Sequence, residues 1–85
     1  MTIRKLNGHN SAQACVTENG NEINLISYVT RVVTVKRENG KRMIECTGTY
    51  SRTTIKHIRW FVREYIPDLT YYDMKNIAGK GFVEI

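Results

Sequence analysis

Four cationic residues recur at helical spacing within residues 51–66, and they are the side chains best suited to bind a charged partner. They are Arg52, Lys56, Arg59 and Arg63. On an α-helix these positions fall on one side and form a stripe of positive charge, which we call the basic face. An arginine guanidinium group can donate two parallel hydrogen bonds to the oxygens of one phosphate, so such a face suits a phosphate-bearing partner. Helical spacing alone supports a merely solvated face of a basic domain at least as well.

Two further side chains, His57 and Trp60, are predicted to lie along the border of the basic face and to join it in contacting a partner. Trp60 is the only tryptophan, and an indole ring beside arginines can stack on an exposed base or anchor a protein interface. Glu64 is the only acid near the four cations, so their mutual repulsion has little compensation. Both features favour a contact surface, although neither separates a nucleic-acid partner from a protein partner.

A second group of cations surrounds Asn39-Gly40, at the predicted tip of a hairpin. Its members, which we call the tip cluster, are Lys36, Arg37, Lys41 and Arg42. The simpler interpretation is a solvated hairpin end, where charges also discourage edge-to-edge association of sheets. We predict the tip cluster as a second partner-binding region. Because the simpler interpretation competes with it, we rank it below the basic face.

Groups able to carry out catalysis are few. Cys15 and Cys46 are the only cysteines and lack the spacing of a metal site, and a reducing cytosol favours two buried thiols over a disulfide. Cys46 and His57 could be imagined as a nucleophile and its base, but Cys46 alternates into the predicted core. No phosphate-binding loop, nucleophile elbow or metal-ligand set is recognisable. The sequence therefore predicts a protein without enzymatic activity, cofactor or metal.

The size and charge of the chain restrict what it can be. Its 85 residues fit one domain with a small core. Lysine and arginine number 13 against 8 acidic residues, and the resulting net charge of +5 suits anionic partners. The N-terminal stretch has no apolar core of signal-peptide length and no later run approaches membrane-spanning length, so we expect a cytoplasmic protein.

Two Asn-Gly pairs, Asn19-Gly20 and Asn39-Gly40, predict β-hairpins because both residue types tolerate the positive φ of a type I′ turn. If each pair supplies the two turn residues, apolar side chains meet across the strands. The expected pairs are Val16 with Ile23, Ala14 with Leu25, Ala12 with Ser27, Val35 with Ile44, and Val33 with Cys46. The run over residues 23–36 is too long for one flat strand, so we expect a bend or bulge near residues 28–31 to divide it. The result is a four-stranded antiparallel meander.

The stretch from Ser51 to Ile66 predicts an amphipathic helix that lies on this sheet. Its apolar side consists of Ile55, Ile58, Val62, Tyr65 and Ile66, with Phe61 on the flank. Ser51 or Thr53 can cap the start of the helix by accepting a bond from its free N–H groups. Pro67 ends the helix, because the residue before a proline is steered away from helical geometry.

The remaining segments are short. Residues 1–10 predict an extended lead-in and a turn. A helix over residues 71–78 should begin with a capping box of Thr70 and Asp73 and end at Gly79. Residues 82–85 alternate and predict a fifth strand or an edge addition. Together the elements predict a single α+β domain, in which the antiparallel four-stranded meander is packed by one amphipathic helix and followed by a short helix and strand.

Two stretches carry a resemblance to known sequences. They are Ser27-Tyr28-Val29-Thr30, which reads S-Y-x-T, and residues 49–58, which read T-Y-S-x-T-T-x-K-H-I. With the opening TIRKLNGHNSAQACVTENGN, they make nearly the whole chain resemble a group of short uncharacterised single-domain proteins of bacteriophages and mobile elements. The resemblance brings no established activity and no catalytic residues. It implies a setting, because small phage proteins often inhibit host defence, as anti-CRISPR proteins do, or regulate the phage programme.

Three functions are compatible with these observations. The leading prediction is a non-enzymatic inhibitor of a bacterial nucleoprotein defence machine such as a CRISPR nuclease, acting through the basic face in the host cytosol. The second is a regulator that binds DNA or RNA directly with the same helix. The third is a structural or scaffold protein that self-associates, for example as a homodimer, through a sheet edge near residues 82–85.

Overall fold

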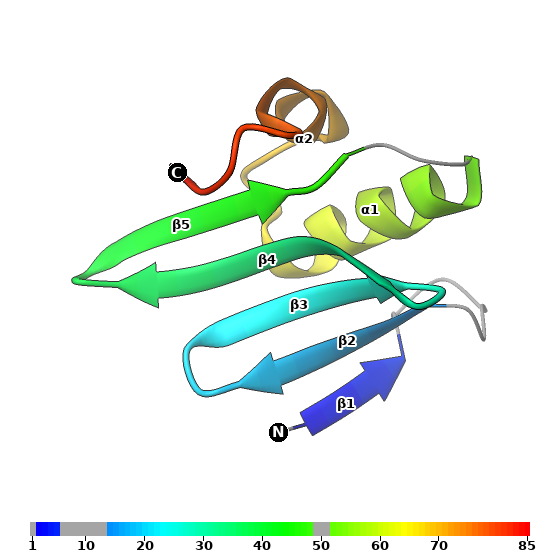
Figure 1. Ribbon diagram of the computed structural model, residues 1–85, viewed down its shortest axis with the longest axis horizontal. Helices are drawn as coiled ribbons and strands as arrows, with labels where there is room; N and C mark the ends of the chain where they lie inside the picture. The colour runs from blue at the N-terminus through cyan, green and yellow to red at the C-terminus, as the bar shows by residue number, and fades with distance from the viewer. Residues whose placement is uncertain (1, 6–13, 49–51) are drawn as a thin grey trace.

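Figure 1 shows the computed structural model of the chain, which describes residues 2–5, 14–48 and 52–85. In chain order the elements are β1 (Thr2–Lys5), β2 (Ala14–Asn19), β3 (Glu22–Ser27), β4 (Thr30–Glu38), β5 (Lys41–Cys46), α1 (Arg52–Tyr65), α2 (Tyr71–Ile77) and β6 (Val83–Glu84). The strands form one antiparallel sheet in the order β1-β2-β3-β4-β5-β6. The predicted α+β class and the meander from β2 to β5 are confirmed, and β1 and β6 extend the sheet at its edges.

The hairpin between β4 and β5 follows the prediction. Val35 lies opposite Ile44 and Val33 opposite Cys46. The two turn residues have positive φ angles, 54° at Asn39 and 76° at Gly40. A type I′ turn requires left-handed geometry at both central positions, and asparagine and glycine are the residues that adopt it at least cost.

The hairpin between β2 and β3 turns one residue later than predicted, at Gly20 and Asn21, so the expected register is wrong. Val16 lies opposite Leu25, and Ala14 lies opposite Ser27. Gly20 has a φ of 62°, and glycine suits the first central position of a two-residue hairpin turn. The shift moves each partner by two residues, which leaves every side chain on its predicted face. The expected pairing of Ala12 lies outside the described residues.

The predicted division of the run over residues 23–36 is confirmed as a complete reversal of the chain. The turn is at Tyr28 and Val29, and Tyr28 has a φ of 59°. A register shift follows Leu25, so Ile26 pairs with Arg31 and Val32 is the extra residue of a bulge. Val32 is buried, as are the three residues that follow it in β4, Val33, Thr34 and Val35.

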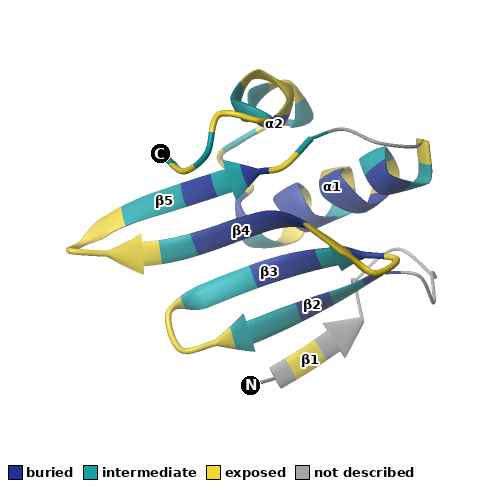
Figure 2. Cartoon of the chain, in the orientation of Figure 1, coloured by how far each residue is buried: buried dark blue, intermediate teal, exposed yellow. Residues whose placement is uncertain are grey.

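Helix α1 packs across one face of the sheet against β3, and α2 lies beside β5 (Figure 1). The helix buries more than the predicted stripe, as the dark segments of α1 in Figure 2 show. Its buried residues are Thr54, His57, Ile58, Phe61 and Val62, followed after the helix by Ile66. Ile55 and Tyr65, which we expected inside, are only half-buried. The buried side is therefore rotated toward Thr54 and His57.

The ends of the helices follow the sequence signals in part. Helix α1 begins at Arg52, so Thr53 lies inside it and is not its cap, while Ser51 lies outside the described residues. The capping box of α2 is present, since the Thr70 amide donates to the Asp73 carboxylate at 2.8 Å and the Thr70 hydroxyl accepts from the Asp73 amide at 3.3 Å. Gly79 follows this helix with a φ of 77°.

The last strand closes one edge of the sheet. In β6, Val83 pairs with Ile44 of β5, and the Ile85 amide donates to the Arg42 carbonyl at 2.9 Å. The predicted edge addition is thus confirmed. Neither of the two helices in the described part of the chain has the length and apolar character needed to cross a membrane.

Candidate functional site

All four cations of the basic face are exposed. The ion pairs within the described part of the chain are Arg31–Glu45, Lys36–Glu38, Lys41–Glu84 and Arg42–Asp68. None of them includes a residue of the basic face. Glu64 is the only acid on α1, and the positions three and four residues from it hold no member of the basic face. Over the described residues, the positive charge of this face is uncompensated.

Two of these cations are held against aromatic rings. The Arg63 guanidinium lies 4.7 Å from the centre of the Trp60 ring, and the Arg59 guanidinium lies 5.0 Å from the centre of the Tyr71 ring. Both distances are within the range of cation–π attraction. Trp60 is half-buried and packs against the core, which fits its predicted place at the border of the face. The rings restrain the guanidinium groups without neutralising them.

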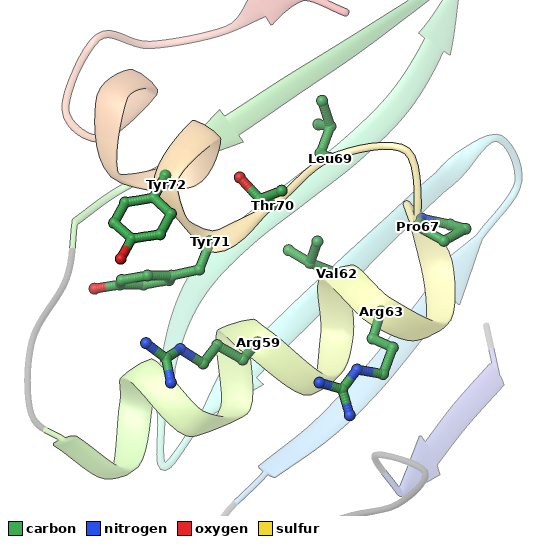
Figure 3. Close-up of a pocket in the computed structure, with 8 residues that line it drawn as sticks. All are labelled: Arg59, Val62, Arg63, Pro67, Leu69, Thr70, Tyr71 and Tyr72. Carbon is green, nitrogen blue, oxygen red and sulfur yellow. The ribbon is translucent and has the colours of Figure 1, made fainter.

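A groove of about 440 Å³ opens between α1 and α2, beside the two restrained arginines (Figure 3). We call it the α1–α2 groove. Its lining residues are Arg59, Val62, Arg63, Pro67, Leu69, Thr70, Tyr71 and Tyr72. Tyr71 and Tyr72 were not among the site residues predicted from the sequence. Their adjacency in a basic chain was a signal, but only the docking of α2 beside α1 brings them to Arg59.

His57 is not on the surface, and its predicted place in the partner-binding site is wrong. Its side chain is fully buried (0% exposed), with Nδ1 2.8 Å from the Ser27 hydroxyl oxygen. That oxygen lies 3.0 Å from the Thr54 hydroxyl, so the three side chains form a buried polar cluster between β3 and α1. Buried polar groups require such partners. The cluster also joins the two stretches that carry the resemblance, at Ser27 and at Thr54 and His57.

The tip cluster differs from the basic face because acids compensate most of it. Lys36 pairs with Glu38 at 3.2 Å, and its ammonium group lies 4.1 Å from the centre of the Phe82 ring. Lys41 pairs with Glu84 at 3.8 Å. Arg42 bonds Asp68, and this hydrogen bond lowers the pKa of the Asp68 carboxyl below its ordinary value.

Arg37, the fourth member of the tip cluster, is exposed, and its backbone amide donates to the Asn21 carbonyl at 3.2 Å. This bond ties the tip of the second hairpin to the turn of the first. The tip cluster is therefore held largely by contacts within the chain.

Both cysteines are free, as predicted, but the prediction that both are buried is wrong for Cys15, which is half-buried. Cys46 is buried, and burial raises the pKa of its thiol, which makes the reactive thiolate scarcer. Its Sγ lies 3.8 Å from the Gly48 carbonyl oxygen. Within residues 2–5, 14–48 and 52–85 there is no group of three or more His, Cys, Asp or Glu side chains that could hold a metal ion.

Comparison with known protein families gives a match. A family described as "Family of unknown function (DUF8033)" matches residues 1–81. No curated protein matches the chain, and no solved structure matches it. The surface described above is therefore the basis for inferring what the protein does.

Proposed function

We propose, for a chain that belongs to the family of unknown function DUF8033, a non-enzymatic role in which the basic face of α1 binds the phosphates of a nucleic acid. The observation that carries this proposal is the exposure of four cations without an ion pair among the described residues. Keeping like charges one turn apart costs stability in the isolated protein. An anionic partner would remove that cost on binding.

The dimensions of the basic face support a phosphate backbone as the partner. From Arg52 to Arg63 the helix rises about 16 Å, at about 1.5 Å per residue. Successive phosphates of one strand are about 3.4 Å apart along a duplex axis, so a length of about 16 Å corresponds to roughly five phosphate spacings. The restrained guanidinium groups of Arg59 and Arg63 favour this contact, because less side-chain freedom is lost when they bind.

The resemblance to short phage proteins supports a narrower setting for this activity. In that setting the protein acts in the bacterial cytosol and inhibits a nucleoprotein defence machine, such as a CRISPR nuclease. It does so by binding the phosphates of the nucleic acid that the machine carries. No cofactor is required. The alternative is a direct DNA- or RNA-binding regulator, which would use the same four side chains on free nucleic acid.

Binding is tested by fluorescence anisotropy with labelled single-stranded and duplex DNA at low and moderate salt. We expect binding that weakens steeply with salt, because phosphate contacts release counterions. The double variant Arg59→Glu/Arg63→Glu should lose binding. The matched control is Arg37→Glu/Lys41→Glu, which makes the same change of charge at two exposed residues of the tip cluster and should retain most of it. No binding to either probe at low salt would reject the proposal.

The setting is tested by adding the protein to a CRISPR nuclease cleaving a DNA target. Inhibition by the wild type, and its loss in Arg59→Glu/Arg63→Glu, would support the inhibitor. Nucleic-acid binding without inhibition, and without co-migration with the effector, would support the regulator instead. Inhibition that survives the double variant would move the contact away from the basic face.

A further inference from the structure

We infer that the α1–α2 groove is a subsite for one nucleotide of a single-stranded nucleic acid, in which Arg59 and Arg63 bind the phosphate and Tyr72 stacks on the base. The inference rests on the proposed function. It specifies that the bound nucleic acid is single-stranded and that one of its nucleotides lies beside the basic face. It adds α2, which the basic face does not include, as the element that contacts the base.

The phosphate side of the subsite is formed by Arg59 and Arg63. They are one helical turn apart, so their Cβ atoms are about 5–6 Å from each other, and both line the groove. Figure 3 shows the Arg59 side chain extending from α1 toward Tyr71, and the Arg63 side chain extending from the next turn of the helix. Each guanidinium lies against a different ring, Tyr71 for Arg59 and Trp60 for Arg63. Two positioned guanidinium groups that have no carboxylate partner among the described residues suit one phosphate between them.

The base side of the subsite is formed by Tyr72. Its side chain is 71% exposed, whereas the neighbouring Tyr71 is half-buried and already contacts Arg59. The two tyrosine rings are 6.3 Å apart and tilted by 57°, so Tyr72 is not covered by a parallel stack with Tyr71. The capping box of Thr70 and Asp73 fixes the start of α2, where Tyr72 is located. An exposed ring on a fixed backbone beside two arginines is a stacking surface for a base.

The shape of the groove favours a single strand over a duplex. The groove also has an apolar wall, formed by Val62, Pro67 and Leu69. Its volume, about 440 Å³, is within the range of small-molecule sites, about 300–1,000 Å³. In a duplex both faces of a base are stacked on neighbouring bases, so Tyr72 could not reach one. An unstacked base can turn toward the ring, while the apolar wall contacts the sugar.

The test uses anisotropy titrations of the full chain and its variants with labelled oligo(dT) of about 12 nucleotides, a length within the range bound by small single-strand binders. The second probe is its duplex with oligo(dA). We expect Tyr72→Ala to weaken oligo(dT) binding about tenfold and to leave duplex binding unchanged. Tyr72→Phe keeps the ring and should bind oligo(dT) like the wild type. Thermal unfolding of each variant confirms that the exposed substitution leaves the fold intact.

Salt titrations separate the phosphate contact from the base contact. The plot of log K against log salt has a negative slope. Arg63→Gln should make this slope less steep by about 0.7, because one phosphate contact is lost. Tyr72→Ala should lower the affinity and leave the slope unchanged, because stacking releases no counterions. Equal slopes for Arg63→Gln and the wild type would remove Arg63 from the subsite.

The failure of this inference is distinguishable from the failure of the proposed function. If the wild type binds neither probe at low salt, the proposed function and the subsite are both rejected. If the wild type binds and Tyr72→Ala binds oligo(dT) equally well, only the subsite is rejected. The subsite is also rejected if Tyr72→Ala weakens both probes to the same extent, since the ring would then not distinguish a single strand.

Discussion

The basic face and the tip cluster each contain four cations, yet the fold treats them differently. At the tip cluster, Glu38, Glu84 and Asp68 each pair with one cation. On α1, none of the four cations forms an ion pair with an acid among the described residues, and two of them lie against aromatic rings. Net charge alone cannot make this distinction. Cations that the fold leaves uncompensated are the better guide to a binding surface, because their charge remains available to a partner.

The largest expected effect concerns the buried cluster that determines which side of α1 faces water. Ser27→Ala removes the hydroxyl between Thr54 and His57, and we expect the free energy of unfolding to fall by about 2 kcal/mol. Urea denaturation measures this change. The matched control is Thr30→Ala, on an exposed residue of the same hairpin, which should stay within about 0.5 kcal/mol of the wild type. Equal effects of the two substitutions would show that the cluster does not hold α1 in place.

A smaller effect, a gain in stability expected in only one of the two regions, tests the contrast directly. Lys56 lies four residues after Arg52 and three before Arg59, so Lys56→Gln should relieve repulsion and raise the free energy of unfolding by about 0.5 kcal/mol at low salt. The gain should disappear in high salt, which screens exposed charges. Lys41→Gln removes an attraction to Glu84 and should give no gain. Stabilisation by both substitutions would contradict the contrast.

The smallest effect is the pH dependence of the ion pair between Arg42 and Asp68. The pKa of Asp68 is lowered in the folded protein from the ordinary 3.8, mainly by its hydrogen bond to Arg42. A lowered folded-state pKa stabilises the fold above pH 3.8, and this contribution is lost as the pH falls through the folded-state value. Asp68→Asn should therefore be slightly less stable than the wild type at neutral pH and equal to it in strong acid. Thermal unfolding across this range measures the difference, and a pH-independent gap would exclude the ion pair as its cause.

The elements that the sequence predicts well are those with local causes. Asn39-Gly40 specifies its own turn, and Thr70 and Asp73 specify the start of α2 within four residues. The exposure of the basic face also follows from helical spacing. The first hairpin shows the limit of local signals, because the sequence Asn-Gly-Asn over residues 19–21 contains two overlapping turns that preserve the same faces.

What the sequence could not predict depends on contacts between distant segments. Helical periodicity assigns His57 to a polar side, but Ser27, 30 residues earlier, supplies a hydroxyl that lets it lie inside. The compensation of Arg42 has a similar cause, because Asp68 is 26 residues away and meets it only after α1 has crossed the sheet. The α1–α2 groove likewise requires the docking of α2. Helical and hairpin patterns predict where the charges lie, and long-range packing determines which of them remain available to a partner.

The order of the strands has a consequence for how fast the chain folds. From β3 to β5 every strand pairs with the strand before it in sequence through a two-residue turn, so each of these pairings closes a short loop. Short loops have a small entropy cost, and folding rates rise as the average sequence separation of contacts falls. Three successive two-residue turns can therefore form independently, and the docking of α1 completes the core. We expect this chain to fold quickly for a protein built around a sheet.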